Sequence, residues 1–287
     1  MPVFQKILFP VDMSDSSTAA ASFVEAMAKR FQAEVTMLHV LELPPGYVTD
    51  WYGYMALVDT NAIRDARKGE FDTYLMDRFA GLTVRREMQE GDPAQIISNY
   101  ASEHGTDLIM MPTHGYGIFR SMLLGSVTAK VLHDAACAVW TGVHVEETPA
   151  TASECERIMC AVDLTDKSIP AMQFAAKLAQ DFQAKLWLVH AVPAAETRPQ
   201  KYFEGDLEVF LQEEARKAIG KLQEAAGVVA QLCIGAGEVP HVVHDAALHH
   251  NADLVVIGRG HATRTLGRLR TNVYSIIRQA PCPVISV

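Results

Sequence analysis

The sequence predicts an α/β fold that is written twice along one chain. Three observations support this: an internal repeat, an alternation of strand-like and helix-like segments, and a length of 287 residues, which exceeds the usual single domain of ~100–200 residues. The repeat is clearest where Lys6-Ile-Leu-Phe-Pro-Val-Asp12 returns as Arg157-Ile-Met-Cys-Ala-Val-Asp163. We therefore expect two domains, residues 1–145 and 155–287, joined by a Glu/Thr/Pro/Ala linker near residues 143–154.

Apolar runs of strand length alternate with amphipathic runs of helical period in the first repeat. The expected strands cover residues 4–11, 35–40, 82–88, 107–111 and 137–141, and the expected helices cover about 20–31, 61–79, 93–105 and 126–133. Asp92 and Pro93 provide an N-cap and a first helical position, and Pro112 is expected to stop the fourth strand. Strands separated by helices predict parallel pairing, so each domain should be an open, parallel, five-stranded sheet with helices on both faces.

The long connection over residues 42 to about 61 contains prolines, glycines and aromatic residues. It is too long for a tight turn, and its length predicts a functional flap.

Composition excludes several classes of function. The net charge of -9 argues against a general nucleic-acid or membrane-surface binder, because such surfaces are basic. Five cysteines without a C-x-x-C pair indicate reduced thiols, and no signal peptide or membrane-spanning run is apparent, so we expect a cytoplasmic protein. Cys137 and Cys282 lie in apolar runs and are interpreted as buried hydrophobic residues.

A glycine-containing loop over residues 112–128 follows the fourth strand and leads into a helix, with Ser126 or a neighbour as the expected cap. Glycines such as Gly115 and Gly125 let backbone N–H groups approach an anion, and a helix start favours negative charge. The loop is therefore predicted to hold the phosphates of a nucleotide.

Asp12 follows the first strand and should meet this loop at the carboxyl edge of the sheet. Two roles are open for it: a ligand contact, or a cap for the helix that follows. We favour the ligand role because Asp163 repeats the position.

The loop resembles the signature of the universal stress protein family, in its tandem two-domain form. The family pattern is G-x-x-G, nine residues, and then Gly-Ser or Gly-Thr. Gly115, residues 116–124 and Gly125-Ser126 fit this spacing. Pro112 departs from it by standing where the first glycine belongs, which removes an N–H and restricts φ. The resemblance implies a Rossmann-like fold of the adenine nucleotide alpha hydrolase type.

Similarity to the ATP-binding branch of the family implies a role for each matching residue. Asp12 would accept from the adenine and Val40 would contact the base through its backbone. Gly115 would lie against the ribose and phosphates. The donors to the phosphate oxygens would be Gly125, Ser126 and Val127. The expected cofactor is ATP, with or without Mg²⁺, and no catalytic or metal-binding residue is predicted.

The second repeat differs at the corresponding loop, where Arg270 stands at the position of Gly125 and the loop is one residue shorter. Its arginines, among them Arg259 and Arg268, suggest either an anion site or an interface loop that no longer binds nucleotide. We favour the interface.

The predicted function is that of an ATP-binding stress or signalling module that acts through nucleotide-dependent assembly or partner binding. The alternatives are a weak ATPase or nucleotidyl-transfer enzyme, and a ligand-free dimerisation scaffold. The loop carries no Asp or Glu, which disfavours the enzyme. The resemblance also implies that residues 137–141 and 282–287 pair antiparallel within the chain, and that two chains form a homodimer.

Overall fold

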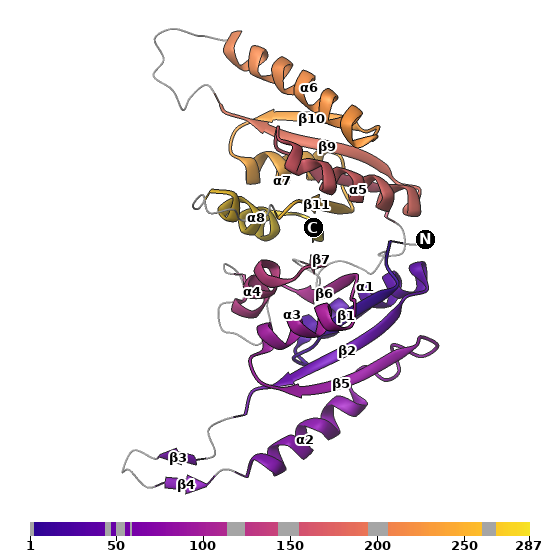
Figure 1. Ribbon diagram of the computed structural model, residues 1–287, viewed down its shortest axis with the longest axis vertical. Helices are drawn as coiled ribbons and strands as arrows, with labels where there is room; N and C mark the ends of the chain where they lie inside the picture. Colours follow the sequence, from indigo (N-terminus) through magenta and orange to yellow (C-terminus); the bar gives the residue numbers. More distant parts are fainter. Residues whose placement is uncertain are drawn as a thin grey trace.

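The computed structural model describes residues 3–43, 47–49, 55–57, 59–113, 124–142, 155–194, 206–259 and 268–287. Ten strands form one sheet in the order β10-β9-β8-β11-β12-β7-β6-β1-β2-β5, with helices on both faces (Figure 1). The prediction of a tandem α/β fold with parallel five-stranded halves is confirmed. The two sheets are also joined edge to edge into one.

The first half supplies the five strands at one end of this sheet. Its strands are β1 (Lys6–Pro10), β2 (Glu34–Leu41), β5 (Val84–Glu90), β6 (Leu108–Pro112) and β7 (Ala138–Gly142). Its helices are α1 (Asp15–Phe31), α2 (Thr60–Thr73), α3 (Pro93–Glu103) and α4 (Ser126–Asp134). A separate antiparallel hairpin, β3 (Tyr47–Thr49) with β4 (Met55–Leu57), lies in the long connection that precedes α2 (Figure 1).

The second half repeats the same order. Its strands are β8 (Arg157–Ala161), β9 (Lys185–Val192), β10 (Gln231–Ala236), β11 (Leu254–Ile257) and β12 (Val284–Ser286). Its helices are the short 3₁₀ helix η1 (Asp166–Ser168), α5 (Ile169–Phe182), α6 (Asp206–Ala226), α7 (Val239–His249) and α8 (Arg268–Gln279). None of the helices in the described part of the chain combines the length and apolar character that a bilayer crossing needs.

The order in which the chain adds strands to the sheet reverses beside the first strand of each half. In the first half β1 pairs in parallel with β2 on one side and with β6 on the other. The chain therefore proceeds to β2 and β5 in one direction and returns to β6 and β7 in the other. Ligands of open α/β sheets bind at such a switch point, outside the carboxyl ends of the strands.

The two halves meet where β12 pairs antiparallel with β7, in a register that places Ile285 opposite Trp140. Two side chains add to the pairing: Thr141 Oγ1 donates to the Val284 carbonyl at 3.3 Å, and Ser286 Oγ donates to the Val139 carbonyl at 3.4 Å. Each half thereby covers the edge strand of the other, which removes two open sheet edges.

Two hydrophobic cores lie on opposite faces of the sheet, and each contains residues of both halves. One core joins α1 and α5 and includes Phe4 and Phe174, whose ring centroids are 6.0 Å apart. The other joins α3, α4, α7 and α8 and includes Val139 and Val284. Both cores therefore continue across the junction of the halves.

Local sequence explains where several elements begin and end. Asp92 caps α3 by accepting from the Gln95 amide at 3.1 Å, with Pro93 in the first turn, so this predicted cap is confirmed. Helix α2 ends at Thr73 and not near residue 79 as predicted. Arg86 explains the early end, because its guanidinium donates to the carbonyls of Phe71 and Tyr74 at the helix terminus.

Two strand boundaries and one hairpin also differ from the predictions. The third strand of the first half covers Val84–Glu90, shifted from residues 82–88. Pro112 is the last residue of β6, paired with Gly142, and does not lie outside the strand. The hairpin within the long connection was not predicted, because each of its strands has only three residues.

Candidate functional site

The candidate site lies at the carboxyl ends of β1, β2 and β6. Helix α4 begins directly beside the end of β6. The Gly125 amide donates to the Thr113 carbonyl at 2.9 Å, and the buried Thr128 hydroxyl donates to the Pro112 carbonyl at 3.1 Å. These two bonds fix the start of α4 against the end of the strand. Sequence reasoning missed both threonines.

The N-terminus of α4 has no side-chain cap. Gly125 is the N-cap residue, and the first helical bond runs from the Ala129 amide to the Gly125 carbonyl at 2.9 Å. The cap was predicted at Ser126 or a neighbour, and the neighbour Gly125 holds it; Ser126 is the first helical residue, and it is exposed. By helix geometry the N–H groups of Ser126, Val127 and Thr128 have no acceptor within the helix, so this end attracts an anion.

Gly125 differs from its expected role in one respect. Its N–H is already bonded to Thr113, so it is not among the donors that point outward. Its φ of -57° and ψ of 143° are extended, a conformation that any residue adopts. Glycine matters at this position because it places no side chain at the N-terminus of α4.

Asp12 organises the turn between β1 and α1. Its Oδ1 accepts from the Ser14 amide at 3.0 Å and from the Ser17 hydroxyl at 2.7 Å. Ser14, not Asp12, is the N-cap of α1, because its hydroxyl accepts from the Ser17 amide at 3.2 Å. The carboxylate therefore supports the helix start from two residues before the cap, at the edge of the sheet.

Asp163 repeats this arrangement in the second half. Its Oδ1 accepts from the Thr165 amide at 3.0 Å, from the Thr165 hydroxyl at 2.6 Å and from the Ser168 hydroxyl at 2.8 Å. The repeat of the aspartate is thus explained by a shared turn, and it does not by itself favour a ligand role. The sequence carries this signal as Asp-x-Ser-x-x-Ser at Asp12 and Asp-x-Thr-x-x-Ser at Asp163.

Val40 lies at the same edge as Asp12. It is the penultimate residue of β2, half-buried, and it packs against the core that contains α3 and α4. The ends of β1 and β2 are held together by two bonds: the Val11 amide donates to the Leu38 carbonyl at 2.9 Å, and Nδ1 of His39 bonds the Val11 carbonyl at 2.8 Å. The structure thus brings the predicted residues Asp12, Val40, Gly125, Ser126 and Val127 to the carboxyl edge of neighbouring strands.

Gly115, the expected linker and residues 260–267 lie outside the described residues.

The corresponding helix of the second half begins earlier. With Cys137 aligned to Cys282, Ser126 matches Thr271 and Gly125 matches Arg270. Helix α8 starts at Arg268, so it begins three residues (271 minus 268) before the position that matches the start of α4. Arg270 therefore lies inside a helical turn at the place where the first half has a glycine cap.

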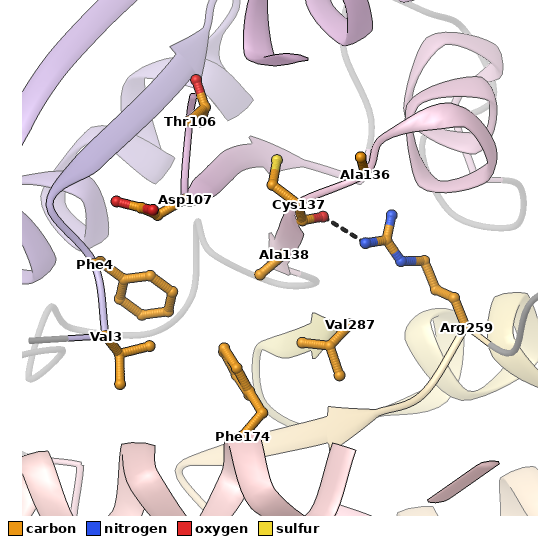
Figure 2. A pocket seen from close by; sticks show the side chains of 10 residues that line it. All are labelled: Val3, Phe4, Thr106, Asp107, Ala136, Cys137, Ala138, Phe174, Arg259 and Val287. Carbon is orange, nitrogen blue, oxygen red and sulfur yellow. Dashed lines mark hydrogen bonds between the residues drawn. The ribbon is translucent and has the colours of Figure 1, made fainter. Parts of the chain in front are cut away.

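A cavity of about 320 Å³ lies between the two halves (Figure 2). It is lined by Val3, Phe4, Thr106, Asp107, Ala136, Cys137, Ala138, Phe174, Arg259 and Val287. Its first-half residues precede β1, β6 and β7 or, in the case of Ala138, begin β7, so the cavity lies at the amino edge of that half. It is separate from the candidate site, which lies at the opposite edge.

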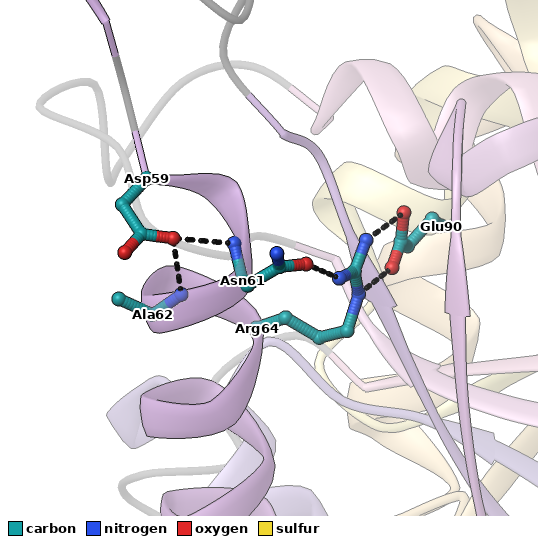
Figure 3. Close-up of polar contacts among 5 residues, drawn as sticks. All are labelled: Asp59, Asn61, Ala62, Arg64 and Glu90. Atoms are coloured by element: carbon teal, nitrogen blue, oxygen red, sulfur yellow. Dashed lines mark hydrogen bonds and ion pairs between the residues drawn. The ribbon is translucent and has the colours of Figure 1, made fainter.

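The long connection returns to the sheet near the candidate site through α2. Asp59 caps this helix by accepting from the amides of Asn61 and Ala62 (Figure 3). Arg64 then forms a two-pronged ion pair with Glu90, the last residue of β5, and donates to the Asn61 side chain at 2.6 Å. The start of α2 is thereby attached to the carboxyl end of the edge strand.

The structure shows how potential metal ligands and two of the thiols are placed among the described residues. No group of three or more His, Cys, Asp or Glu residues there is arranged to hold a metal ion. Burial raises the pKa of Cys160 and of Cys282 to about 12, which keeps these thiols protonated. Such thiols are poor nucleophiles.

Fold and site together define a tandem, doubly wound α/β protein with an anion-attracting helix start in its first half. The sequence pattern of the Universal stress protein family matches residues 4–141 and 154–287. The chain belongs to the universal stress protein family, with one copy of the family unit in each half.

Individual relatives agree with this assignment. A universal stress protein of Methanocaldococcus jannaschii is 32% identical over 137 residues, which is 48% of this chain and 81% of that protein. The crystal structure of a universal stress protein from Archaeoglobus fulgidus matches with a TM-score of 0.69 at 20% identity, over 99% of this chain and 96% of that one. A functionally unknown protein from Pseudomonas aeruginosa matches with a TM-score of 0.65 at 18% identity, over 99% and 92%. At these identities the two structures show the fold alone.

Proposed function

We propose that the chain binds one adenine nucleotide, ATP, at the carboxyl edge of its first half, and acts as a nucleotide-responsive stress or signalling module. The observation that supports this most is the start of α4, which lies at the switch point of the sheet without a side-chain cap. A helix start of this kind provides both N–H donors and a partial positive charge for phosphate oxygens.

In the proposed complex, different residues along the edge of the sheet contact the phosphates, the base and the ribose. The amides of Ser126 and Val127 and the Ser126 hydroxyl donate to phosphate oxygens, and Gly125 allows close approach. Asp12 accepts from the amino group of the base, since a carboxylate has about four lone-pair sites and can support the α1 turn as well. Val40 contacts the base through its backbone, and Gly115 lies against the ribose and phosphates. Mg²⁺ accompanies the phosphates when it is present.

Pro112 is compatible with this proposal. Gly258 holds the matching position in the second half, and its φ is not left-handed, so this place in the fold does not require glycine. The carbonyl of Pro112 accepts from Thr128 and thereby helps to fix α4.

The second half is not part of the proposed site. Its helix starts nearly one turn earlier, and Arg270 stands where close approach would require a small residue. We therefore expect one nucleotide per chain.

The helix start can be tested by removing a single N–H group. Proline is tolerated at the first helical position, and Gly125 already has the extended ψ that a residue before proline requires. Ser126→Pro should therefore fold normally while losing one donor and the hydroxyl. Ser126→Ala is the matched control, because it loses the hydroxyl alone.

Isothermal titration with ATP, ADP and AMP measures the outcome. We expect Ser126→Pro to bind ATP at least ~10-fold more weakly than Ser126→Ala, which corresponds to the loss of one charge-assisted hydrogen bond. Equal affinities of the two variants would reject α4 as the phosphate site. A flat trace for the wild type, together with no nucleotide extracted from freshly purified protein, would reject nucleotide binding and leave the dimerisation scaffold.

We further propose that the protein acts in the cytoplasm as a homodimer. All five cysteines are free in the structure, which suits a reducing compartment. Light scattering with and without ATP tests the homodimer and its dependence on nucleotide.

A further inference from the structure

Helix α4 is held at both ends, and the two attachments come from different halves of the chain. Its N-terminal end is bonded to Pro112 and Thr113 of its own half. Its C-terminal end and the segment that follows are bonded to Arg259, which comes after β11 of the other half. Figure 2 shows the bond to the Cys137 carbonyl in that segment. A helix of nine residues is too short to be stable alone, so these tertiary contacts determine its position.

Arg259 binds the last carbonyls of α4 and the segment that follows. Its Nη1 donates to the Ala135 carbonyl at 2.8 Å and to the Leu132 carbonyl at 3.4 Å, and its Nη2 donates to the Cys137 carbonyl. A guanidinium group suits this place, because several unpaired carbonyls and the negative end of the helix dipole converge there. The Arg259 backbone is itself fixed, since its amide donates to the Val287 carbonyl at 2.7 Å.

A second residue of the other half reaches the same helix. The Tyr274 hydroxyl of α8 donates to the Ala129 carbonyl at 3.2 Å. The second half therefore contacts α4 along its length, from Ala129 to the residues after its C-terminus.

The matching position of the first half carries a shorter side chain. In the repeat, Arg259 corresponds to Thr113, whose hydroxyl donates to the Gly142 carbonyl within its own half at 3.2 Å. The long side chain, Arg259, therefore belongs to the second half, whose loop is altered. It holds α4 of the first half, which has the glycine cap.

We infer that Arg259 is a positioning residue for the phosphate site, through which the second half sets the affinity of the first half for nucleotide. This inference rests on the proposed function. The N–H groups of Ser126 and Val127 bind phosphate best when α4 is already held in place, because ordering the helix would otherwise reduce the binding free energy. The second half thus acts as a support for a site that it does not share.

The test compares Arg259→Met with a matched variant, Arg30→Met. Arg30 also joins the two halves: it donates to the Asp181 carbonyl at 2.6 Å and lies 5.6 Å from the centre of the Phe182 ring. It contacts the end of α5, however, and not α4. Both variants lose an arginine between the halves, and only one loses the support of α4.

Affinity for ATP is the first measurement. We expect Arg259→Met to raise the Kd about 3- to 10-fold, the size of effects that are carried through a supporting element, with Arg30→Met near the wild type. Arg259→Lys should recover part of the loss, because it keeps the charge at the helix end but not the forked donors. Equal loss in Arg259→Met and Arg30→Met would overturn the inference, since general loosening of the halves would then explain it.

Hydrogen exchange without nucleotide is the second measurement, and it separates this inference from the proposed function. We expect faster exchange of the amides in residues 129–135 in Arg259→Met and unchanged exchange there in Arg30→Met. If the wild type binds no nucleotide, the proposed function fails and so does the link to affinity, while this pattern would still show that Arg259 holds α4. Unchanged exchange in Arg259→Met would overturn its role as a support.

Discussion

Phe31 of α1 and Phe182 of α5 meet edge to face across the junction of the two halves, with ring centroids 5.4 Å apart and an interplanar angle of 87°. Each ring ends a helix at the same position of the repeat. The contact therefore belongs to the fold as a whole and not to one half.

Phe182→Ala should lower the free energy of unfolding by about 3–5 kcal/mol, because it removes a buried ring and leaves a cavity. We expect calorimetry to show one transition at lower temperature, since both cores extend through both halves. Two separate transitions would contradict the view that the halves unfold together.

Gly125→Arg copies the residue of the second half into the first. The extended backbone at Gly125 accepts any side chain, so the melting temperature should change little. ATP binding should be lost, because the side chain would occupy the mouth of α4. Titration and thermal melting of the same samples give both values, and Gly125→Ala should be intermediate. A variant that still binds ATP with wild-type affinity would show that this place need not be small.

Asp12→Ala and Asp163→Ala each remove the carboxylate that supports the turn after the first strand of a half. Because both carboxylates support a helix start, each variant should lose about 1 kcal/mol of stability in denaturant unfolding. ATP affinity should fall in Asp12→Ala alone. If both variants keep full affinity, Asp12 has only the structural role.

The buried cysteines should resist alkylation in the folded protein. Burial raises the pKa of Cys155, Cys160 and Cys282 to about 12, above the ~8.5 of an unfolded chain. Because the folded-state pKa is raised, burial of the protonated thiols contributes to stability. This contribution is fully present below about pH 8.5 and is lost as the pH rises towards 12. Mass spectrometry after iodoacetamide at pH 8 should find the buried residues Cys160 and Cys282 unmodified, and modified once urea is added. Rapid labelling of Cys160 in the native protein would contradict its burial.

The repeat and its periodicity were sufficient to predict the topology, because buried strands and capped helices leave local signals such as Asp92-Pro93. Contacts between distant residues left none. The early end of α2 depends on Arg86, which lies in β5, the next element of the chain, and no local pattern reveals that bond. The hairpin β3–β4 was missed because three-residue strands carry no readable alternation.

For the candidate site, the sequence allowed its residues to be proposed, from the loop pattern, the ends of the strands and the family resemblance. The hydrogen bonds of these residues could not be predicted. Only the structure shows that Gly125 is the cap in place of Ser126, and that its amide is used by Thr113. The role of Arg259 could not be inferred either, since in sequence it lies 124 residues from Ala135.

The antiparallel join of β7 and β12 has a consequence for how the two halves can change. Two separate copies of one half, paired by the same strand, would carry every substitution twice, once on each side of the symmetry axis. Covalent linkage lifts that restriction, so the second half can have an arginine, Arg259, at a position where the first half has a threonine, Thr113. In a single chain, the second half can therefore carry substitutions that the first half does not share.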